Sequence, residues 1–333
     1  MARVLLTGGS GFVASHILNT LLERGYFVTT TVRSSGKGEK MLSSHRSTTK
    51  LSYVVVKDIA AKGAFDVAVQ AAPPFDYVIH TASPFPDTFT DPVKDLLNPA
   101  IEGTVGILKA IKTYAPNVKR VVITSSFAAI VNTASPPKVY DEISWNPVTW
   151  DDAIADSSLT YRGSKTLAEK AAWNFVENET PAFDLVTINP PLVYGPAVES
   201  LGDLGGLNTS NQRIRDFIQG KHGEGELPPT GTFLWVDVRD LALAHIRALE
   251  VPAAGGHRVF VTAGHCSNKR IVDAIRATHP QFASRLPNKP IDDFPEECYG
   301  YDNSKARNLL GVEFRSLQEG IGDTVDSLLK FFH

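Results

Sequence analysis

This sequence has very few cysteines and a small net charge. Its 333 residues include only Cys266 and Cys298, which excludes a disulfide framework and gives too few thiols to form a metal site by themselves. The formal net charge is only -3, so nothing in the overall balance favours nucleic acid or an anionic membrane as a partner. The sequence also lacks an apolar run near the ~20 residues of a membrane span and a secretory signal pattern at its start. We therefore expect a cytoplasmic protein with no metal and no membrane attachment.

What the sequence contains instead is an alternation of strand and helix patterns. Short apolar runs predict buried strands, and the segments between them show helical spacing of apolar residues. Continuous apolar strands alternating with helices are typical of an α/β fold with a parallel sheet covered on both faces. The predicted strands are 4–7, 26–32, 51–56, 77–80, 120–124 and 183–189, and the predicted helices include 11–24, 101–114 and 155–178.

After residue 190 the alternation weakens, which indicates a second, smaller unit. Residues 233–236 resume a strand, and Asp237 is placed to cap a helix that runs to Leu249. We expect the larger domain to comprise residues 1–190 and 231–250. A smaller C-terminal α/β domain would then comprise residues 191–230 and 251–333 and close over the first as a substrate domain.

A glycine-rich turn joins the first strand to the first helix. Thr7-Gly8-Gly9-Ser10-Gly11 and the following Phe12-Val13-Ala14 form the pattern T-G-x-x-G-x-x-A. Glycines allow a tight turn and let the backbone approach a pyrophosphate, while the helix N-terminus offers free N–H groups and a partial positive charge. This context predicts a doubly wound, Rossmann-type sheet that binds a dinucleotide. An ordinary strand-to-helix turn is the simpler alternative.

The residues after the second strand distinguish NAD from NADP. An acidic side chain there would bind a ribose 2′-hydroxyl, whereas a basic one would accommodate a 2′-phosphate. Arg33 and Lys37 lie in this stretch, and residues 32–37 contain no Asp or Glu. The pattern favours NADPH, although a solvated basic loop would have the same composition. Asp58, just after the third strand, suits either the adenine edge or the capping of a turn.

Tyr161 and Lys165 lie four residues apart on a predicted helix and therefore share a face. A nearby ammonium lowers the pKa of a phenol, which would make Tyr161 a proton donor for the alkoxide formed when hydride reaches a carbonyl. Ser125 and Ser126 follow the 120–124 strand, at the sheet edge where ligands bind. One of these hydroxyls could orient the carbonyl, but the spacing does not say which. A surface helix pair and a serine turn are the alternatives.

Taken together, these motifs resemble the extended short-chain dehydrogenase/reductase superfamily. Within it, the sequence is similar to plant dihydroflavonol reductases, and more so to yeast NADPH-dependent methylglyoxal (isovaleraldehyde) reductases and fungal carbonyl reductases. The matching stretches extend over nearly the whole chain: 7–14, 32–34, 80–85, 124–126, 142–147, 161–165, 168–173, 189–190, 194–196, 207–210 and 236–240. The resemblance implies an NADPH-dependent reduction of aldehydes and ketones to alcohols.

The resemblance also implies roles for individual residues. Ser126 is the implied catalytic serine, Tyr161 the proton donor, and Lys165 the residue that binds the nicotinamide ribose and lowers the pKa of Tyr161. A hydrophobic substrate pocket would be lined by Phe85, Phe127, Leu192 and Trp235, for each of which core packing is the alternative. Fungal relatives often have tyrosine where Leu192 stands, which makes this pocket less polar. The implied cofactor contacts are Gly8, Ser10, Gly11, Phe12, Val13, Arg33, Lys37, Asp58, Thr81, Ala82, Ser83, Tyr161, Lys165, Pro190 and Val193.

Two other functions use the same fold. A sugar-nucleotide epimerase or dehydratase would usually carry an acidic residue at the position of Arg33, and a dehydratase would want a Thr-Asp-Glu-like run in place of residues 124–126. A non-catalytic NADP-sensing regulator could dispense with Tyr161 and Lys165. The residues present favour the reductase. Its partner would be a small carbonyl compound, and it would act as a monomer or homodimer.

Overall fold

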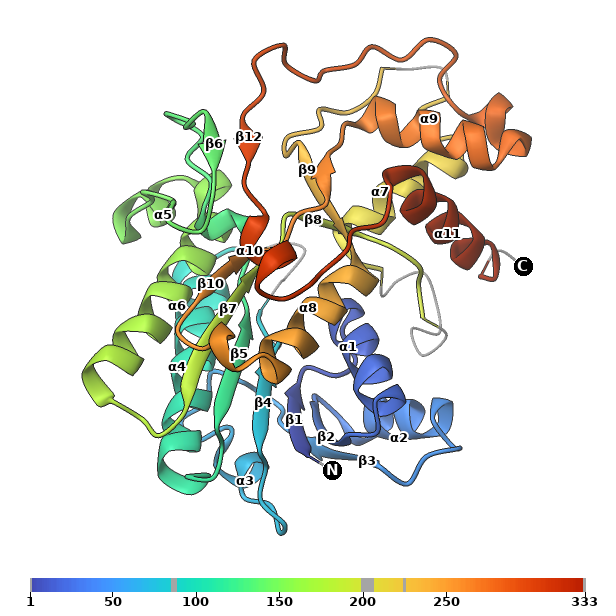
Figure 1. Cartoon of the computed structure of the whole chain (residues 1–333). Helices are drawn as coiled ribbons and strands as arrows, with labels where there is room; N and C mark the ends of the chain where they lie inside the picture. Colours follow the sequence, from blue (N-terminus) through green and yellow to red (C-terminus); the bar gives the residue numbers. More distant parts are fainter. Residues whose placement is uncertain (1, 85–88, 199–206, 224–225, 332–333) are drawn as a thin grey trace.

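A parallel sheet of seven strands forms the centre of the molecule (Figure 1). The computed structural model describes residues 2–84, 89–198, 207–223 and 226–331. The strand order is β10-β7-β5-β4-β1-β2-β3. From β1 the chain first adds β2 and β3 on one side and then returns to add β4 on the other, and doubly wound sheets bind ligands at this switch between β1 and β4. This confirms the predicted Rossmann-type α/β fold. The strands are β1 (Arg3–Thr7), β2 (Phe27–Val32), β3 (Leu51–Val55), β4 (Tyr77–His80), β5 (Arg120–Thr124), β7 (Asp184–Asn189) and β10 (Arg258–Phe260).

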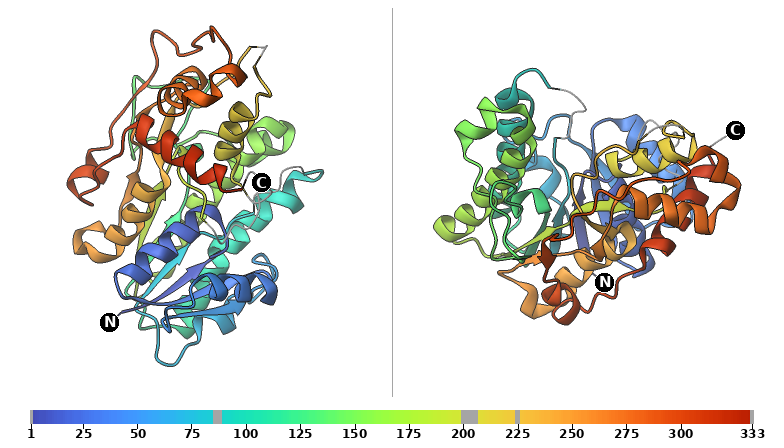
Figure 2. Two further views of the ribbon diagram at one scale, coloured as in Figure 1. Left: turned by 90° about the vertical axis from the view of Figure 1, so that its right-hand side faces the viewer. Right: turned by 90° about the horizontal axis from the view of Figure 1, so that it is seen from above.

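Two layers of helices cover the sheet because its strands are apolar on both sides. In β1, Val4 and Leu6 pack into one core, while Leu5 between them packs into the other, as the alternation of side chains along a strand requires. Figure 2, seen from above, shows α4 and α6 on one side of the sheet and α1 and α8 on the other. The first layer contains α1 (Phe12–Glu23), α2 (Ser35–Ser44) and α8 (Val238–Glu250), and the second α3 (Asp66–Val69), α4 (Asn98–Tyr114) and α6 (Ser157–Glu179). Within the described ranges, no helix is long and apolar enough to cross a membrane.

A second, smaller unit is built on a sheet of three strands, in the order β11-β9-β8. Its helices enclose a separate apolar core that includes Trp235 and Cys266. Strands β6 (Val139–Tyr140) and β12 (Gly300–Tyr301) form a further short pair. The smaller unit contains β8 (Leu192–Tyr194), β9 (Leu234–Asp237), β11 (Gly264–His265), α7 (Thr209–Ile218), α9 (Asn268–Thr278) and α11 (Leu317–Leu329).

The predicted domain boundaries differ from the structure at two strands. β10 was assigned to the substrate domain but pairs with β7 at the edge of the seven-stranded sheet. β9 was assigned to the larger domain but pairs with β8 and β11. Both strands comprise only three or four residues, which is too few to show a hydrophobic period. The sequence therefore did not indicate which sheet each strand joins. The rest of the predicted division stays a prediction.

Local capping fixes the start of several helices. The predicted helix 155–178 is α6, which begins after Asp156, whose side chain caps it. A separate short helix, α5 (Trp150–Ala155), precedes it and begins with a reciprocal capping box of Thr149 and Asp152. Asp237 caps α8 by accepting a hydrogen bond from the Arg239 amide, as predicted. Helix α2 was not predicted, because it contains two glycines, which are poor helix formers.

Arg120 at the start of β5 ties the bottom of the large sheet to α8. The residue is 6% exposed, and each of its five N–H donors has an acceptor. Its Nε and Nη2 donate to the Asp184 carboxylate at 2.6 and 2.8 Å. The other bonds go to the carbonyl oxygens of Ala248, Val251 and Pro252, at and just beyond the end of α8. One guanidinium therefore joins β5 and β7 to a helix C-terminus, where a cation is favourable.

We expect Arg120→Met to lower the free energy of unfolding by about 2–3 kcal/mol, measured by urea denaturation, because three carbonyl groups lose a buried donor and Asp184 loses its partner. The estimate is at the low end because Asp184 is 43% exposed. The neighbouring Lys119 pairs with Asp76 at the surface, so Lys119→Met is the matched control, with an expected loss below about 1 kcal/mol. Equal losses in the two variants would contradict the role given to Arg120.

Candidate active site

The glycine-rich turn lies against the ends of β2 and β4. Gly8 has a φ of +72°, which favours glycine, and its amide donates to Thr31 Oγ1 at 3.1 Å. A Cβ at Gly9 would collide with Thr30 Oγ1, so no larger side chain fits between the turn and β2. Gly11 then begins α1 without a side chain to cap it. The first amides of this helix are therefore available to an anion, which is the arrangement a pyrophosphate needs.

The segment after β4 is tied to this turn. Thr7 Oγ1 hydrogen-bonds His80 Nδ1 at 2.8 Å and accepts from the Ala82 amide at 3.1 Å. Thr81 Oγ1 donates to the Thr7 carbonyl at 2.6 Å. Ser83 Oγ accepts from Lys165 Nζ at 3.0 Å, which connects the segment to α6. The structure thus brings predicted cofactor contacts from two loops together with Lys165.

Ser126, Tyr161 and Lys165 meet at the carboxyl edge of the sheet. Ser126 follows β5 and accepts from the Ala128 amide at 3.1 Å, which caps the short 3-10 helix η2 (Phe127–Ala129). It also hydrogen-bonds Tyr161 of α6. Burial raises the pKa of Tyr161, and the bond with Ser126 lowers it. The lowering of this pKa by Lys165 stays a prediction.

Burial acts on Lys165 in the opposite direction. It lowers the pKa of the ammonium to about 8, and the charge of Glu169 raises it in part. His80 faces the same ammonium, and burial together with Lys165 lowers its pKa to about 3. His80 is therefore neutral at physiological pH, and the pKa of Lys165 lies closer to that pH than the pKa of an ordinary lysine does.

The structure also separates the two serines that spacing could not distinguish. Ser125 Oγ donates to Glu169 Oε2 at 2.6 Å, beneath the site. Ser126 is the serine that faces Tyr161. Its predicted role as the catalytic serine is consistent with this position.

The predicted 2′-phosphate contacts lie beside the end of β2. Arg33 directly follows β2, and Lys37 lies in the first turn of α2 instead of a loop; both are exposed. Asp58 accepts from the Ala60 amide at 2.9 Å, which is the turn-capping alternative. Ser10 and Gly11 are exposed at the glycine turn, Phe12 is buried and Val13 partly buried. Pro190 precedes β8 and accepts from the Phe127 amide, and Val193 lies within β8.

The predicted substrate pocket is only partly consistent with the structure. Phe127 is buried and stacks on Phe260 with ring centres 5.2 Å apart. Trp235 is buried in the core of the smaller unit beside Tyr194. Both positions correspond to the core-packing alternative. Leu192 is partly exposed in β8, and Phe85 lies outside the described residues.

These residues fit an NADP cofactor. The glycine turn leaves a space that a Cβ would fill, α1 begins without a side-chain cap, and two exposed basic side chains, Arg33 and Lys37, follow β2. Sequence analysis gave no role to Glu169 or Arg258, which form a buried pair below the site. The one available signal for Glu169 was its position four residues after Lys165.

The chain belongs to the NAD dependent epimerase/dehydratase family, which it matches over residues 4–263. It is 55% identical to ketoreductase azaE of Aspergillus niger, over 98% of both proteins. It is 37% identical to the NADPH-dependent methylglyoxal reductase GRE2 of Saccharomyces cerevisiae, again over 98% of both. Among solved structures, it resembles yeast methylglyoxal/isovaleraldehyde reductase Gre2 complexed with NADPH, with a TM-score of 0.92 and 36% identity over 99% of both chains. Gre2 of Candida albicans with NADPH gives a TM-score of 0.93 at 36% identity over all of both chains.

Proposed function

We propose that this protein reduces aldehydes and ketones to alcohols with NADPH. The observation that carries the proposal is the convergence of Ser126, Tyr161 and Lys165 at the carboxyl edge of the sheet, next to the glycine turn. The reductases among its relatives support the same reaction and the same cofactor. The protein is thus a carbonyl reductase of the extended short-chain dehydrogenase/reductase type.

The chain's own residues bind the reactants and move one proton. When bound, NADPH would supply a hydride for the carbonyl carbon. The amides at the start of α1 would hold its pyrophosphate, and Arg33 with Lys37 would hold its 2′-phosphate. Ser126 donates a hydrogen bond that orients the carbonyl oxygen, and Tyr161 gives its phenolic proton to that oxygen as negative charge develops. Lys165 places a positive charge beside the phenol and binds the ribose.

We also propose a class of substrate, a cellular compartment and an oligomeric state. The substrate is a small carbonyl compound of aliphatic or aryl type, accepted next to the apolar Leu192. The enzyme acts in the cytoplasm as a monomer or homodimer. Cys266 and Cys298 are both free thiols, which is compatible with a reducing compartment.

The direct test mixes protein, NADPH and a panel of aldehydes, dicarbonyls and aryl ketones, and follows the loss of reduced-nicotinamide absorbance. We expect turnover with several members of the panel and much less with NADH. A parallel arm offers sugar nucleotides with NAD and NADP and looks for epimerised or dehydrated products. Absence of turnover across the carbonyl panel would overturn the proposal, and conversion of a sugar nucleotide would replace it.

The ionisation of Lys165 gives an expected pH dependence. The kcat/KM for NADPH reports the free enzyme, and it should fall as pH rises through about 8, where Lys165 loses its proton. The sign follows because only the protonated amine carries the charge that helps Tyr161 and holds the cofactor. A full pH profile measures this limb. A limb near the ordinary lysine pKa of about 10.4 would contradict it.

A further inference from the structure

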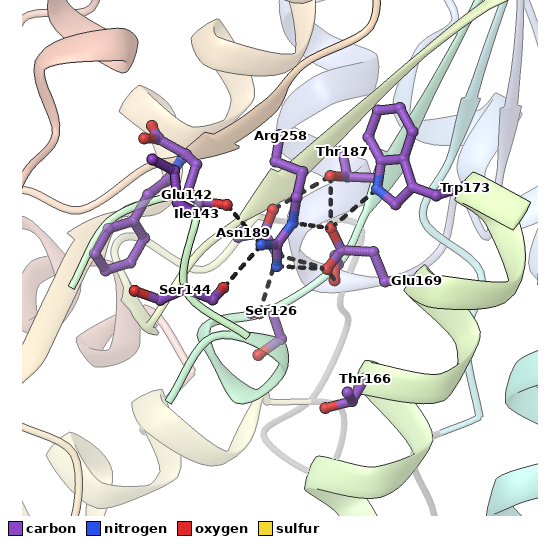
Figure 3. A network of polar contacts seen from close by, with 12 residues as sticks. Ser126, Glu142, Ile143, Ser144, Thr166, Glu169, Trp173, Thr187, Asn189 and Arg258 are labelled. Carbon is purple, nitrogen blue, oxygen red and sulfur yellow. Dashed lines mark hydrogen bonds and ion pairs between the residues drawn. The ribbon is translucent and has the colours of Figure 1, made fainter. Parts of the chain in front are cut away.

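Glu169 is a buried carboxylate placed one helical turn beyond Lys165. The residue is 2% exposed. Its Oε2 accepts from Ser125 Oγ at 2.6 Å and from Asn189 Nδ2 at 2.7 Å. Its Oε1 accepts from Thr187 Oγ1 at 2.8 Å. Figure 3 shows the carboxylate pointing from α6 toward the ends of the strands. Glu169 therefore joins the helix of Tyr161 and Lys165 to β7 and to the end of β5.

Arg258 of β10 supplies the matching positive charge. Its Nε donates to Glu169 Oε1 at 2.7 Å, and its side chain is 9% exposed. Its Nη1 donates to the carbonyl oxygens of Glu142 and Ser144 at 2.6 and 2.8 Å. The guanidinium lies 3.6 Å from the ring centre of Trp145. Arg258 therefore supplies a buried, charge-assisted hydrogen-bond partner for the Glu169 carboxylate.

The Glu169–Arg258 pair influences the catalytic groups in two ways. The first is mechanical: Ser125 precedes Ser126, and Asn189 Nδ2, which binds Glu169, also donates to the Ser126 carbonyl at 3.2 Å. The second is electrostatic, because the charge of Glu169 favours the protonated form of Lys165. Lys165 and Glu169 line a small cavity of about 20 Å³ together with His80, which has room for about one water molecule. Glu169 thus acts on Lys165 mainly through its field.

A purely structural role would not explain this arrangement. Replacing a buried ion pair with apolar residues is often neutral or stabilising, so the pair contributes little that packing could not supply. The other groups near Lys165 are Tyr161, neutral His80 and Ser83. None of them carries a negative charge as long as the Tyr161 phenol keeps its proton. Among the described residues, Glu169 is the anion that sets the field at Lys165.

We propose that Glu169, paired with Arg258, is a positioning residue for carbonyl reduction: its negative charge favours the charged form of Lys165, and its hydrogen bonds fix the distance between Ser126 and the Tyr161–Lys165 face of α6. The proposal rests on the proposed reductase function and assigns that function two further residues. It predicts separate consequences for the charge of Glu169 and for its hydrogen bond to Ser125.

The charge is tested with the double variant Glu169→Gln/Arg258→Met. Glu169→Gln alone would leave Arg258 as an unpaired buried cation and endanger folding, whereas the double variant removes both charges at similar volume. We expect the alkaline limb of kcat/KM for NADPH to move down by about one pH unit. The titration of Lys165 followed by NMR of isotope-labelled lysine, assigned with Lys165→Met, should move equally and needs no turnover. Thr187→Val is the matched control: it removes a hydrogen bond to Glu169 but leaves the charge, so the limb should stay in place.

The mechanical link is tested with Ser125→Ala, a small change that leaves both charges intact. We expect kcat to fall about tenfold, with KM and the alkaline limb unchanged, because the segment that carries Ser126 loses its direct hydrogen bond to Glu169 and keeps only the link through Asn189. An unmoved limb in the folded double variant, or an equal shift in Thr187→Val, would overturn the charge role. Wild-type kcat in Ser125→Ala would overturn the positioning role, and it decides the matter if the double variant does not fold. Wild-type turnover of the carbonyl panel tests the reductase function separately.

Discussion

Tyr161→Phe is expected to reduce kcat by about 10³-fold while NADPH binding stays nearly unchanged. The phenylalanine ring keeps the packing of α6 but has no proton to give to the developing alkoxide, and a positioned acid contributes about 10²–10⁴ to such a rate. Ser126 and Lys165 would remain to bind the substrate and cofactor. Steady-state turnover gives the first quantity, and quenching of protein fluorescence by NADPH gives the second.

Tyr140→Phe serves as the control for this experiment. Tyr140 is buried as well, but its hydroxyl hydrogen-bonds the backbone of Asn132, apart from the catalytic groups. We expect it to cost some stability and little activity. Full activity in Tyr161→Phe would show that another group protonates the oxygen.

Arg33→Asp is expected to move the ratio of kcat/KM for NADPH to that for NADH by about 10²-fold in favour of NADH. The exposed arginine directly after β2 is replaced by the residue type that accepts a ribose 2′-hydroxyl and repels a 2′-phosphate. The size follows from the ~1.5–3 kcal/mol of a hydrogen bond to a charged group. Parallel kinetics with the two cofactors measure the ratio.

The control for Arg33 is Arg46→Asp, which makes the same charge change at an exposed position beyond α2. It should leave the preference within about twofold, since surface charges are screened over about one Debye length. An unchanged preference in Arg33→Asp would show that this residue does not contact the 2′-phosphate. Lys37 on α2 would then be the residue to vary.

The large sheet could be predicted from sequence because its long strands are rich in apolar and β-branched residues, which favour buried strands. Elements whose signal is weak or short could not. Helix α2 contains Gly36 and Gly38, and β10 comprises only three residues, whose sheet partner lies some seventy positions earlier. Pairing of that kind is decided by tertiary packing and leaves no mark in the local pattern.

The catalytic cluster could be predicted from linear motifs because its members sit close together in sequence or at strand ends. The choice between Ser125 and Ser126 could not, since it depends on which hydroxyl faces α6. The link between Glu169 and Arg258 spans 89 residues and joins a helix to an edge strand. Apolar residues such as Phe127 and Trp235 suit both a pocket and a core, and only the packing around them separates the two.

The reactivity of the two cysteines matters in a protein that binds carbonyl compounds, because thiolates attack electrophiles. Cys266 is buried beneath the helices of the smaller unit, and burial raises the pKa of its thiol to about 12. This thiol is therefore protonated at neutral pH, whereas the thiolate is the form that attacks electrophiles. Burial raises the pKa of Cys298 too. Both thiols are thus held in the protonated form, which attacks carbonyl compounds far more slowly than the thiolate does.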